Sequence, residues 1–180
     1  MRYCASPSAV ARRLRRRTGA SLVAIDGAPG SGKSTLARAL ARRLGIRAIH
    51  VDKFLRKRRG AYLTALRWEP LRQAIAASRT TRLIDGVCVL EVLDRIGQRT
   101  HELLYVQRMT RGIWADAEEL IPTSSLDEHL QSLRNERAEL VKFMGHTPDS
   151  GPSLTEQVIR YHAKYKPHEK ATIVYRRADA

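Results

Sequence analysis

One short stretch governs how this chain folds: Gly27-Ala28-Pro29-Gly30-Ser31-Gly32-Lys33-Ser34-Thr35. It fits the pattern G-x-x-x-x-G-K-[ST], whose glycines let the backbone curl so that successive N–H groups point at a phosphate group. An apolar run precedes it at residues 22–25, and residues 36–45 follow with leucine at every fourth position. These patterns predict a buried strand before the loop and a helix after it, so the loop lies at a helix N-terminus. The sequence therefore predicts a binding site for a nucleoside triphosphate.

Each residue type in this loop has a chemical task. The side chain of Lys33 is expected to reach the β- and γ-phosphates, and the hydroxyl of Ser34 is expected to bind Mg²⁺. The predicted nucleotide-binding residues are Gly27, Ala28, Pro29, Gly30, Ser31, Gly32, Lys33, Ser34 and Thr35. The predicted cofactors are ATP and Mg²⁺, with the choice between ATP and GTP left open.

Length and composition set the outer limits. The chain has 180 residues, enough for one domain with a substantial core, and we expect residues 1–180 to form a single domain. No apolar run approaches the ~20 residues that a membrane span requires. Cys4 and Cys88 are too few for a disulfide framework. These features predict a cytoplasmic protein that does not span a membrane.

The formal net charge of +15 raises the question of a nucleic-acid partner. The densest basic cluster, residues 12–17, falls in a segment (residues 1–20) that we expect to form a short basic helix. However, arginines are spread along the whole chain, and no aromatic residues interleave with the basic clusters. A phosphate-handling enzyme also needs positive potential over its cleft. The sequence therefore favours a small-molecule partner over a nucleic acid.

The rest of the chain alternates between strand and helix patterns. Further strands are predicted at residues 47–51, 82–87, 103–107 and 172–175, and helices at residues 61–78, 89–96, 126–144 and 154–164. Pro70 is expected to divide the first of these helices. Such alternation is typical of a parallel sheet with crossover helices. The predicted fold class is α/β, a three-layer P-loop NTPase fold with a five-stranded, mainly parallel sheet flanked by helices.

Two carboxylates lie where parallel-sheet proteins place their chemistry, at the C-terminal ends of strands. Asp85 ends the third strand along the chain and is the expected Mg²⁺ partner beside Ser34. Asp52 ends the second strand and is placed to accept the proton of an attacking hydroxyl. The alternative for either aspartate is a helix N-cap. His50, just before Asp52, is expected to serve packing rather than catalysis.

Four segments resemble one family. Residues 25–37 look like the phosphate loop of uridine kinase-like proteins, a group that includes phosphoribulokinases and pantothenate kinases. Asp52-Lys53-Phe54 resembles that family's Asp-x-Phe element, whose aspartate is the base. Asp85-Gly86-Val87 resembles its Glu-Gly-Ile/Val element, whose acid binds Mg²⁺. Residues 165–174 resemble the segment that leads into its last strand. The resemblance implies a P-loop small-molecule kinase.

The chain also departs from the family. Leu55 stands where the family commonly has tyrosine, Asp85 is one methylene shorter than the usual glutamate, and Thr172 replaces an aspartate. An aspartate still suits a metal ion, since its oxygens are hard ligands.

The largest departure replaces the family's arginine-rich lid. Here residues 107–116 read Gln-Arg-Met-Thr-Arg-Gly-Ile-Trp-Ala-Asp, and we treat residues 108–123 as a candidate lid segment. Arg108 and Arg111 are expected to clamp the transferring phosphate, because the guanidinium fork suits phosphate oxygens. The different surface leaves nucleoside specificity open.

The expected function is ATP-dependent transfer of the γ-phosphoryl group to a hydroxyl of a small molecule, with a nucleoside-like alcohol as the first choice of acceptor. Tyr62 and Trp68 are candidates to contact this acceptor, although aromatic residues are more often part of the core. Alternatives are a kinase for a sugar, a nucleotide, an antibiotic or a nucleic-acid end, an ATP-binding regulatory protein, and a basic nucleic-acid-binding module. Assembly into a homo-oligomer stays open.

Overall fold

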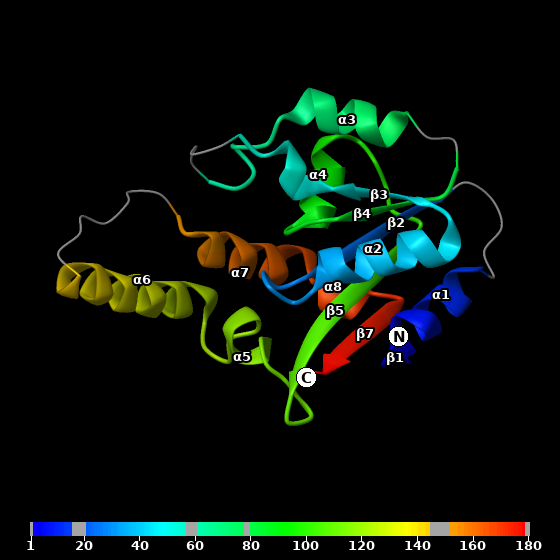
Figure 1. Ribbon diagram of the computed structural model, residues 1–180. Coiled ribbons are helices and arrows are strands. Elements are labelled where there is room, and N and C mark those ends of the chain that lie inside the picture. The colour runs from blue at the N-terminus through cyan, green and yellow to red at the C-terminus, as the bar shows by residue number, and fades with distance from the viewer. Residues whose placement is uncertain (1, 16–20, 57–60, 78–79, 145–151, 179–180) are drawn as a thin grey trace.

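The computed structural model of this protein describes residues 2–15, 21–56, 61–77, 80–144 and 152–178. Its centre is a seven-stranded sheet in the order β1-β7-β5-β2-β4-β3, with β6 paired to β5 outside this path (Figure 1). The strands are β1 Arg2–Cys4, β2 Leu22–Gly27, β3 Arg47–His50, β4 Arg82–Asp85, β5 Glu102–Thr110, β6 Ile113–Trp114 and β7 Ile173–Ala178. All pairs are parallel except β5 with β6.

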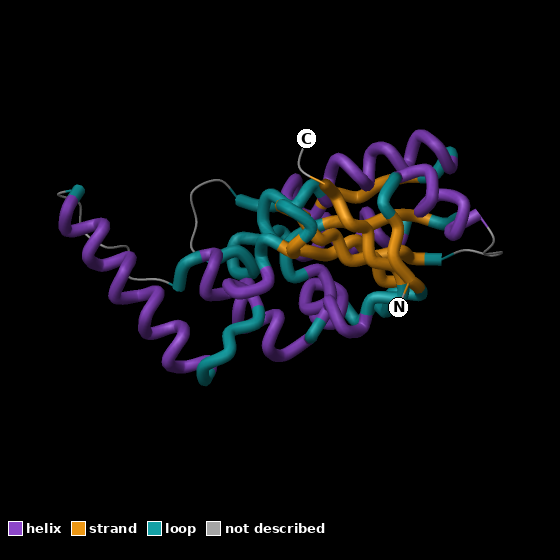
Figure 2. The backbone as a smooth tube through the Cα atoms, turned by 90° about the horizontal axis from the view of Figure 1, so that it is seen from below, coloured by secondary structure: helices purple, strands orange, loops and turns teal. Residues whose placement is uncertain are grey.

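Helices cover both faces of the sheet, as Figure 2 shows from a second direction. The helices are α1 Pro7–Arg15, α2 Lys33–Leu44, the 3₁₀ helix η1 Val51–Phe54, α3 Trp68–Ala76, α4 Val89–Arg95, α5 Ala117–Leu120, α6 Leu126–Phe143, α7 Leu154–Tyr165 and α8 Pro167–Lys170. Much of α6 extends away from the sheet in both views. Within the described residues, no helix combines the length and the apolar character that a membrane crossing demands.

Two apolar cores, one on each face of the sheet, make this the predicted three-layer α/β fold. Alternation along β2 sends Leu22 and Ala24 into the core under α3, α4 and α7, and sends Val23 and Ile25 into the core under α1 and α2. This is the period-2 geometry of a strand that is buried on both faces.

The phosphate loop joins β2 to α2 and depends on a close backbone approach. Gly27 has φ +146°, and a Cβ atom at this position would lie 2.7 Å from the carbonyl oxygen of Val106 on β5. A larger residue would therefore push the loop away from its neighbouring strand. At the far end, α2 stops at Gly45, as its sequence predicts.

The five predicted strands are all present, but the predicted count of five is too low. The two additional strands, β1 and β6, have three and two residues, too few to produce a periodic pattern. The N-terminal segment is accordingly a strand followed by α1, and residues 16–20, at the end of the predicted basic helix, lie outside the described residues.

One helix also begins later than expected. The segment from residue 61 to 67 is a turn rather than a helix, and α3 starts at Trp68. Pro70 therefore sits in the first turn of α3 and does not divide a longer helix, because in that turn its missing N–H costs no hydrogen bond.

Candidate active site

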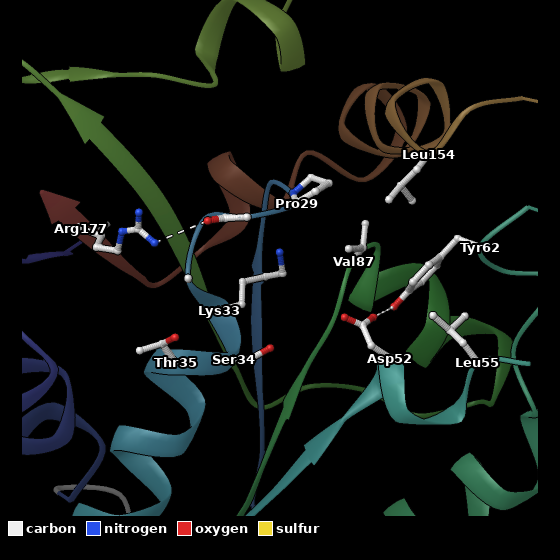
Figure 3. A pocket seen from close by; sticks show the side chains of 12 residues that line it. Pro29, Lys33, Ser34, Thr35, Asp52, Leu55, Tyr62, Val87, Leu154 and Arg177 are labelled. Atoms are coloured by element: carbon white, nitrogen blue, oxygen red, sulfur yellow. Dashed lines mark hydrogen bonds between the residues drawn. The ribbon is translucent and has the colours of Figure 1, made fainter. Parts of the chain in front are cut away.

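A cavity of about 510 Å³ opens at the C-terminal ends of the central strands (Figure 3). The loop before α2, the turns after β3 and β4, and more distant segments all contribute to its wall. The lining residues are Pro29, Gly30, Gly32, Lys33, Ser34, Thr35, Asp52, Leu55, Tyr62, Val87, Leu154 and Arg177. Open α/β sheets bind ligands at this edge, so the cavity is the candidate active site.

Lys33 is the cation in the phosphate loop. Its Nζ donates hydrogen bonds to the carbonyl oxygens of Gly27, at 3.1 Å, and of Ala28, at 2.6 Å. The side chain is only 7% exposed, and this burial lowers the pKa of Lys33, although Asp26, Asp52 and Asp85 oppose the shift. The loop therefore holds a buried ammonium group where a bound phosphate would meet it.

Ser34 and Asp85, predicted to hold Mg²⁺ together, are in direct contact. The Ser34 hydroxyl donates to Asp85 Oδ2 at 2.6 Å, and Asp85 is 2% exposed. Asp85 Oδ1 has no hydrogen-bond partner among the described residues, although His50 Nδ1 lies 2.6 Å away. That contact meets the distance of a hydrogen bond but not its alignment.

This pair fits a magnesium ion. A hydroxyl and a carboxylate are the hard oxygen ligands that Mg²⁺ prefers, and Mg²⁺ commonly takes its other ligands from substrate phosphates and water. Among the described residues, no group of three or more His, Cys, Asp or Glu side chains is placed to enclose a metal. The orphaned Asp85 Oδ1 and the Ser34 hydroxyl therefore match a site that is completed by a nucleotide.

Asp52 lies on the other side of the same cavity, in the first turn of η1. The Tyr62 hydroxyl donates to Asp52 Oδ1 at 2.6 Å, and Figure 3 shows the two side chains meeting. Burial raises the pKa of Tyr62, and Asp52 adds to the shift. Neither predicted aspartate is a helix N-cap, because His50 precedes η1 and Cys88 precedes α4.

A buried carboxylate, Asp26, supports the phosphate loop from behind. Its Oδ1 accepts from the Gly27 N–H at 2.7 Å, and its Oδ2 accepts a hydrogen bond from the Tyr161 hydroxyl on α7. Burial raises the pKa of Asp26 from 3.8 to about 6, despite these hydrogen bonds and nearby Lys33. Asp26 thus links the start of the loop to α7.

The pKa of Asp26 makes stability depend on pH. An acid with a raised pKa contributes stability below its unfolded value of 3.8, and this contribution is lost as pH rises through about 6. We expect the unfolding free energy of wild type, measured relative to that of Asp26→Asn, to decrease by up to about 3 kcal/mol between pH 4 and pH 7. Urea titrations of both proteins at the two pH values measure it. An unchanged difference would contradict the assignment.

The two lid arginines expected from the sequence lie outside the cavity wall. Arg108, on β5, donates to Asp116 Oδ1 at 2.7 Å. Arg111 is an exposed residue in the turn between β5 and β6, with φ 51°. Trp114 on β6 packs edge-on against Tyr105, with ring centroids 5.5 Å apart. The start of the candidate lid segment, residues 108–123, is therefore packed onto the body of the protein.

A third arginine lines the cavity instead. Arg177 Nη1 lies 3.5 Å from the carbonyl oxygen of Gly30, and its guanidinium covers Gly32 so closely that a Cβ there would lie 2.7 Å from Nη1. The sequence reasoning missed Arg177 because no motif contains it. The same rule that selected Asp52 and Asp85, a polar residue at the C-terminal end of a parallel strand, points to it on β7.

Three comparisons with known proteins concern the sequence and the fold of the chain. The sequence model of the AAA domain family matches residues 22–110, from β2 to the end of β5. No curated protein sequence matches the chain. Among solved structures, one described as a possible uridine kinase from Bacillus stearothermophilus is 12% identical, with a TM-score of 0.55, over 94% of this chain and 96% of that one.

Two further solved structures superpose more loosely. A gluconokinase from Sinorhizobium meliloti is 16% identical with a TM-score of 0.45, over 89% of this chain and 84% of that one. A shikimate kinase from Bacteroides thetaiotaomicron is 16% identical with a TM-score of 0.40, over 87% of this chain and 85% of that one. The chain is thus similar in sequence to the AAA domain family over residues 22–110, and its overall fold is similar to that of the first structure.

Proposed function

We propose that this protein is an ATP-dependent kinase that transfers the γ-phosphoryl group to a hydroxyl of a small molecule. One observation carries the proposal: a single cavity holds Lys33 and Ser34 on one side and Asp52 on the other. A nucleotide-binding switch needs only the first side. Phosphoryl transfer needs both, because a second group must orient the attacking hydroxyl.

On the nucleotide side, backbone N–H groups of the loop and Lys33 would bind the phosphates. Lys33 exchanges its bonds to the carbonyl oxygens of Gly27 and Ala28 for bonds to phosphate oxygens. Ser34 and Asp85 would hold Mg²⁺, which supplies positive charge beside the transferring group when it is bound. Catalysis then rests on positioning and electrostatic stabilisation.

On the acceptor side, Asp52 accepts the proton of the attacking hydroxyl, and Tyr62 orients its carboxylate. The neighbouring walls are apolar, formed by Leu55, Val87 and Leu154 (Figure 3). Such walls suit an acceptor that joins a hydroxyl to a planar or apolar part, as a nucleoside does. A sugar, a nucleotide and an antibiotic are the alternative acceptors.

Arg177 supplies a second cation to the nucleotide phosphates in this proposal, since it lies over the loop at Gly30 and Gly32. Arg108 and Arg111 remain candidates for clamping the phosphate, in a state where Arg108 has left Asp116. Two free, buried cysteines, Cys4 and Cys88, fit a reducing compartment, and we place the reaction in the cytoplasm.

Loss of the Arg177 guanidinium is expected to weaken ATP binding about tenfold, the lower end for a partly exposed charge-assisted hydrogen bond. Calorimetric titration of Arg177→Ala with MgATP measures this. Arg176→Ala is the matched control, because Arg176 is exposed and stacks on Tyr3, 3.9 Å from the ring centroid. Equal Kd values for the two variants would remove Arg177 from the site.

The proposed function is tested by ADP release with MgATP against a panel of nucleosides, sugars, nucleotides and aminoglycosides. We expect one class, nucleosides first, to raise turnover well above basal hydrolysis. If no acceptor stimulates turnover while ATP still binds, the protein is an ATP-binding regulatory protein instead.

A further inference from the structure

His50 lies beside Asp85, and neither the motif nor the resemblance assigns it a role. It is the last residue of β3 and is directly paired in register with Asp85, the last residue of β4. Residues that face each other across a strand pair project to the same side of the sheet. The register therefore places the imidazole beside the carboxylate, and His50 Nδ1 lies 2.6 Å from Asp85 Oδ1.

The two oxygens of Asp85 thus have different neighbours. Oδ2 accepts a hydrogen bond from the hydroxyl of Ser34, and Oδ1 faces His50. The carboxylate is 2% exposed, and the His50 side chain is 16% exposed. A buried carboxylate oxygen without a hydrogen bond is costly, and His50 Nδ1 is the polar atom in contact with this oxygen.

The same contact limits how Asp85 can turn. Rotation of a carboxylate about its terminal bond is nearly free, and an aspartate that must present an oxygen to a metal gains from a neighbour that restricts this rotation. Asp85 has one methylene less than glutamate and therefore one rotatable bond less. The orientation of its carboxylate then largely decides where its two oxygens lie. Ser34 restricts one oxygen through α2, and His50 restricts the other through β3.

We propose that His50 is a positioning residue that orients the Asp85 carboxylate toward the magnesium ion of the bound nucleotide. This inference rests on the proposed function only in requiring a magnesium–nucleotide complex, and not in requiring transfer to an acceptor. Groups that orient metal ligands typically change metal affinity about 10–100-fold when they are lost.

Two amide substitutions distinguish a role of His50 in orienting Asp85 from a role in packing, because each amide nitrogen can match one nitrogen position of the imidazole. The side-chain nitrogen of asparagine in His50→Asn can occupy the place of Nδ1, whereas in His50→Gln the amide takes the place of Nε2 and leaves Asp85 Oδ1 without a neighbour. The measured quantity is the ratio of the Kd of the β,γ-imido analogue of ATP in EDTA to its Kd in Mg²⁺, by calorimetry. This ratio reports the coupling between metal and nucleotide, and needs no turnover.

We expect His50→Gln to reduce this ratio about 10–100-fold and His50→Asn to keep it within about threefold of wild type. Binding in EDTA stays unchanged in both. His129→Gln, on α6 outside the cavity, is the matched control. If His50→Gln does not fold, His50→Ser, which also lacks a group at the Nδ1 position, replaces it.

Three results would overturn the inference: equal ratios in His50→Gln and wild type, equal losses in both His50 variants, or a wild-type ratio of one. If the ratio falls only in His50→Gln while no acceptor is phosphorylated, the role of His50 stands and the kinase proposal fails. If an acceptor is phosphorylated while both variants keep the wild-type ratio, the role of His50 alone fails.

Discussion

Replacing Lys33 with methionine is expected to lower the rate of phosphoryl transfer at saturating ATP by about a thousandfold. Methionine keeps much of the length of the side chain but removes the charge that stabilises the phosphates in the transition state. Loss of one preorganised donor typically costs about 10²–10³ in kcat, and a buried charge lies at the upper end of that range. Lys33 is only 7% exposed inside the loop, so water does not replace its ammonium group well.

The measurement is kcat of Lys33→Met with the best acceptor of the panel. Lys170→Met is the control, because Lys170 is an exposed residue at the end of α8. A Lys33→Met enzyme within about tenfold of wild type would mean that the loop lysine does not contact the transferring group, which is incompatible with the site as described.

The second large effect is expected at Asp52. Asparagine at this position keeps the shape and can still accept the Tyr62 hydroxyl, but it cannot take a proton from the acceptor. General-base catalysis typically contributes about 10²–10⁴-fold, so kcat of Asp52→Asn should fall by about a thousandfold. The Kd for MgATP should stay within about twofold, because the Asp52 carboxylate lies across the cavity from the phosphate loop.

Tyr62→Phe provides the graded comparison for Asp52→Asn. It removes the 2.6 Å hydrogen bond to Asp52 Oδ1 and leaves the carboxylate in place. A smaller loss, about tenfold, is expected because only orientation is affected. If Asp52→Asn and Tyr62→Phe both match wild type, Asp52 has no role in proton transfer.

The parts of the site that could be predicted from sequence are those set by the chain's own order. The phosphate loop follows β2, and Asp85 is the last residue of β4, the parallel neighbour of β2. Parallel strands end at the same edge of a sheet, so the contact between Ser34 and Asp85 follows once the strands are recognised. Asp52 reaches the cavity for the same reason, through β3.

What could not be predicted depends on tertiary contacts that leave no local pattern. Tyr62 meets Asp52 because a turn, not the expected helix, carries it to the cavity. Arg177 follows the strand-end rule on β7, but its approach to the phosphate loop depends on β7 lying beside β5, which no local pattern reveals. Arg108 pairs with Asp116 across a short hairpin. The sequence alone does not indicate whether an arginine here binds an internal carboxylate or a bound phosphate. The register between β3 and β4 likewise places His50 on Asp85.

The most direct test of the central claim follows the labelled γ-phosphoryl group of ATP in a single turnover with protein in excess. With Mg²⁺ and the best acceptor present, the label should move from ATP to the acceptor hydroxyl in wild type and should remain on ATP in Asp52→Asn over the same time. The opposite result is label released only as inorganic phosphate, at the same rate in both proteins and independent of the acceptor. That outcome would make this protein a nucleotide hydrolase or switch, and it would remove Asp52 from the chemistry.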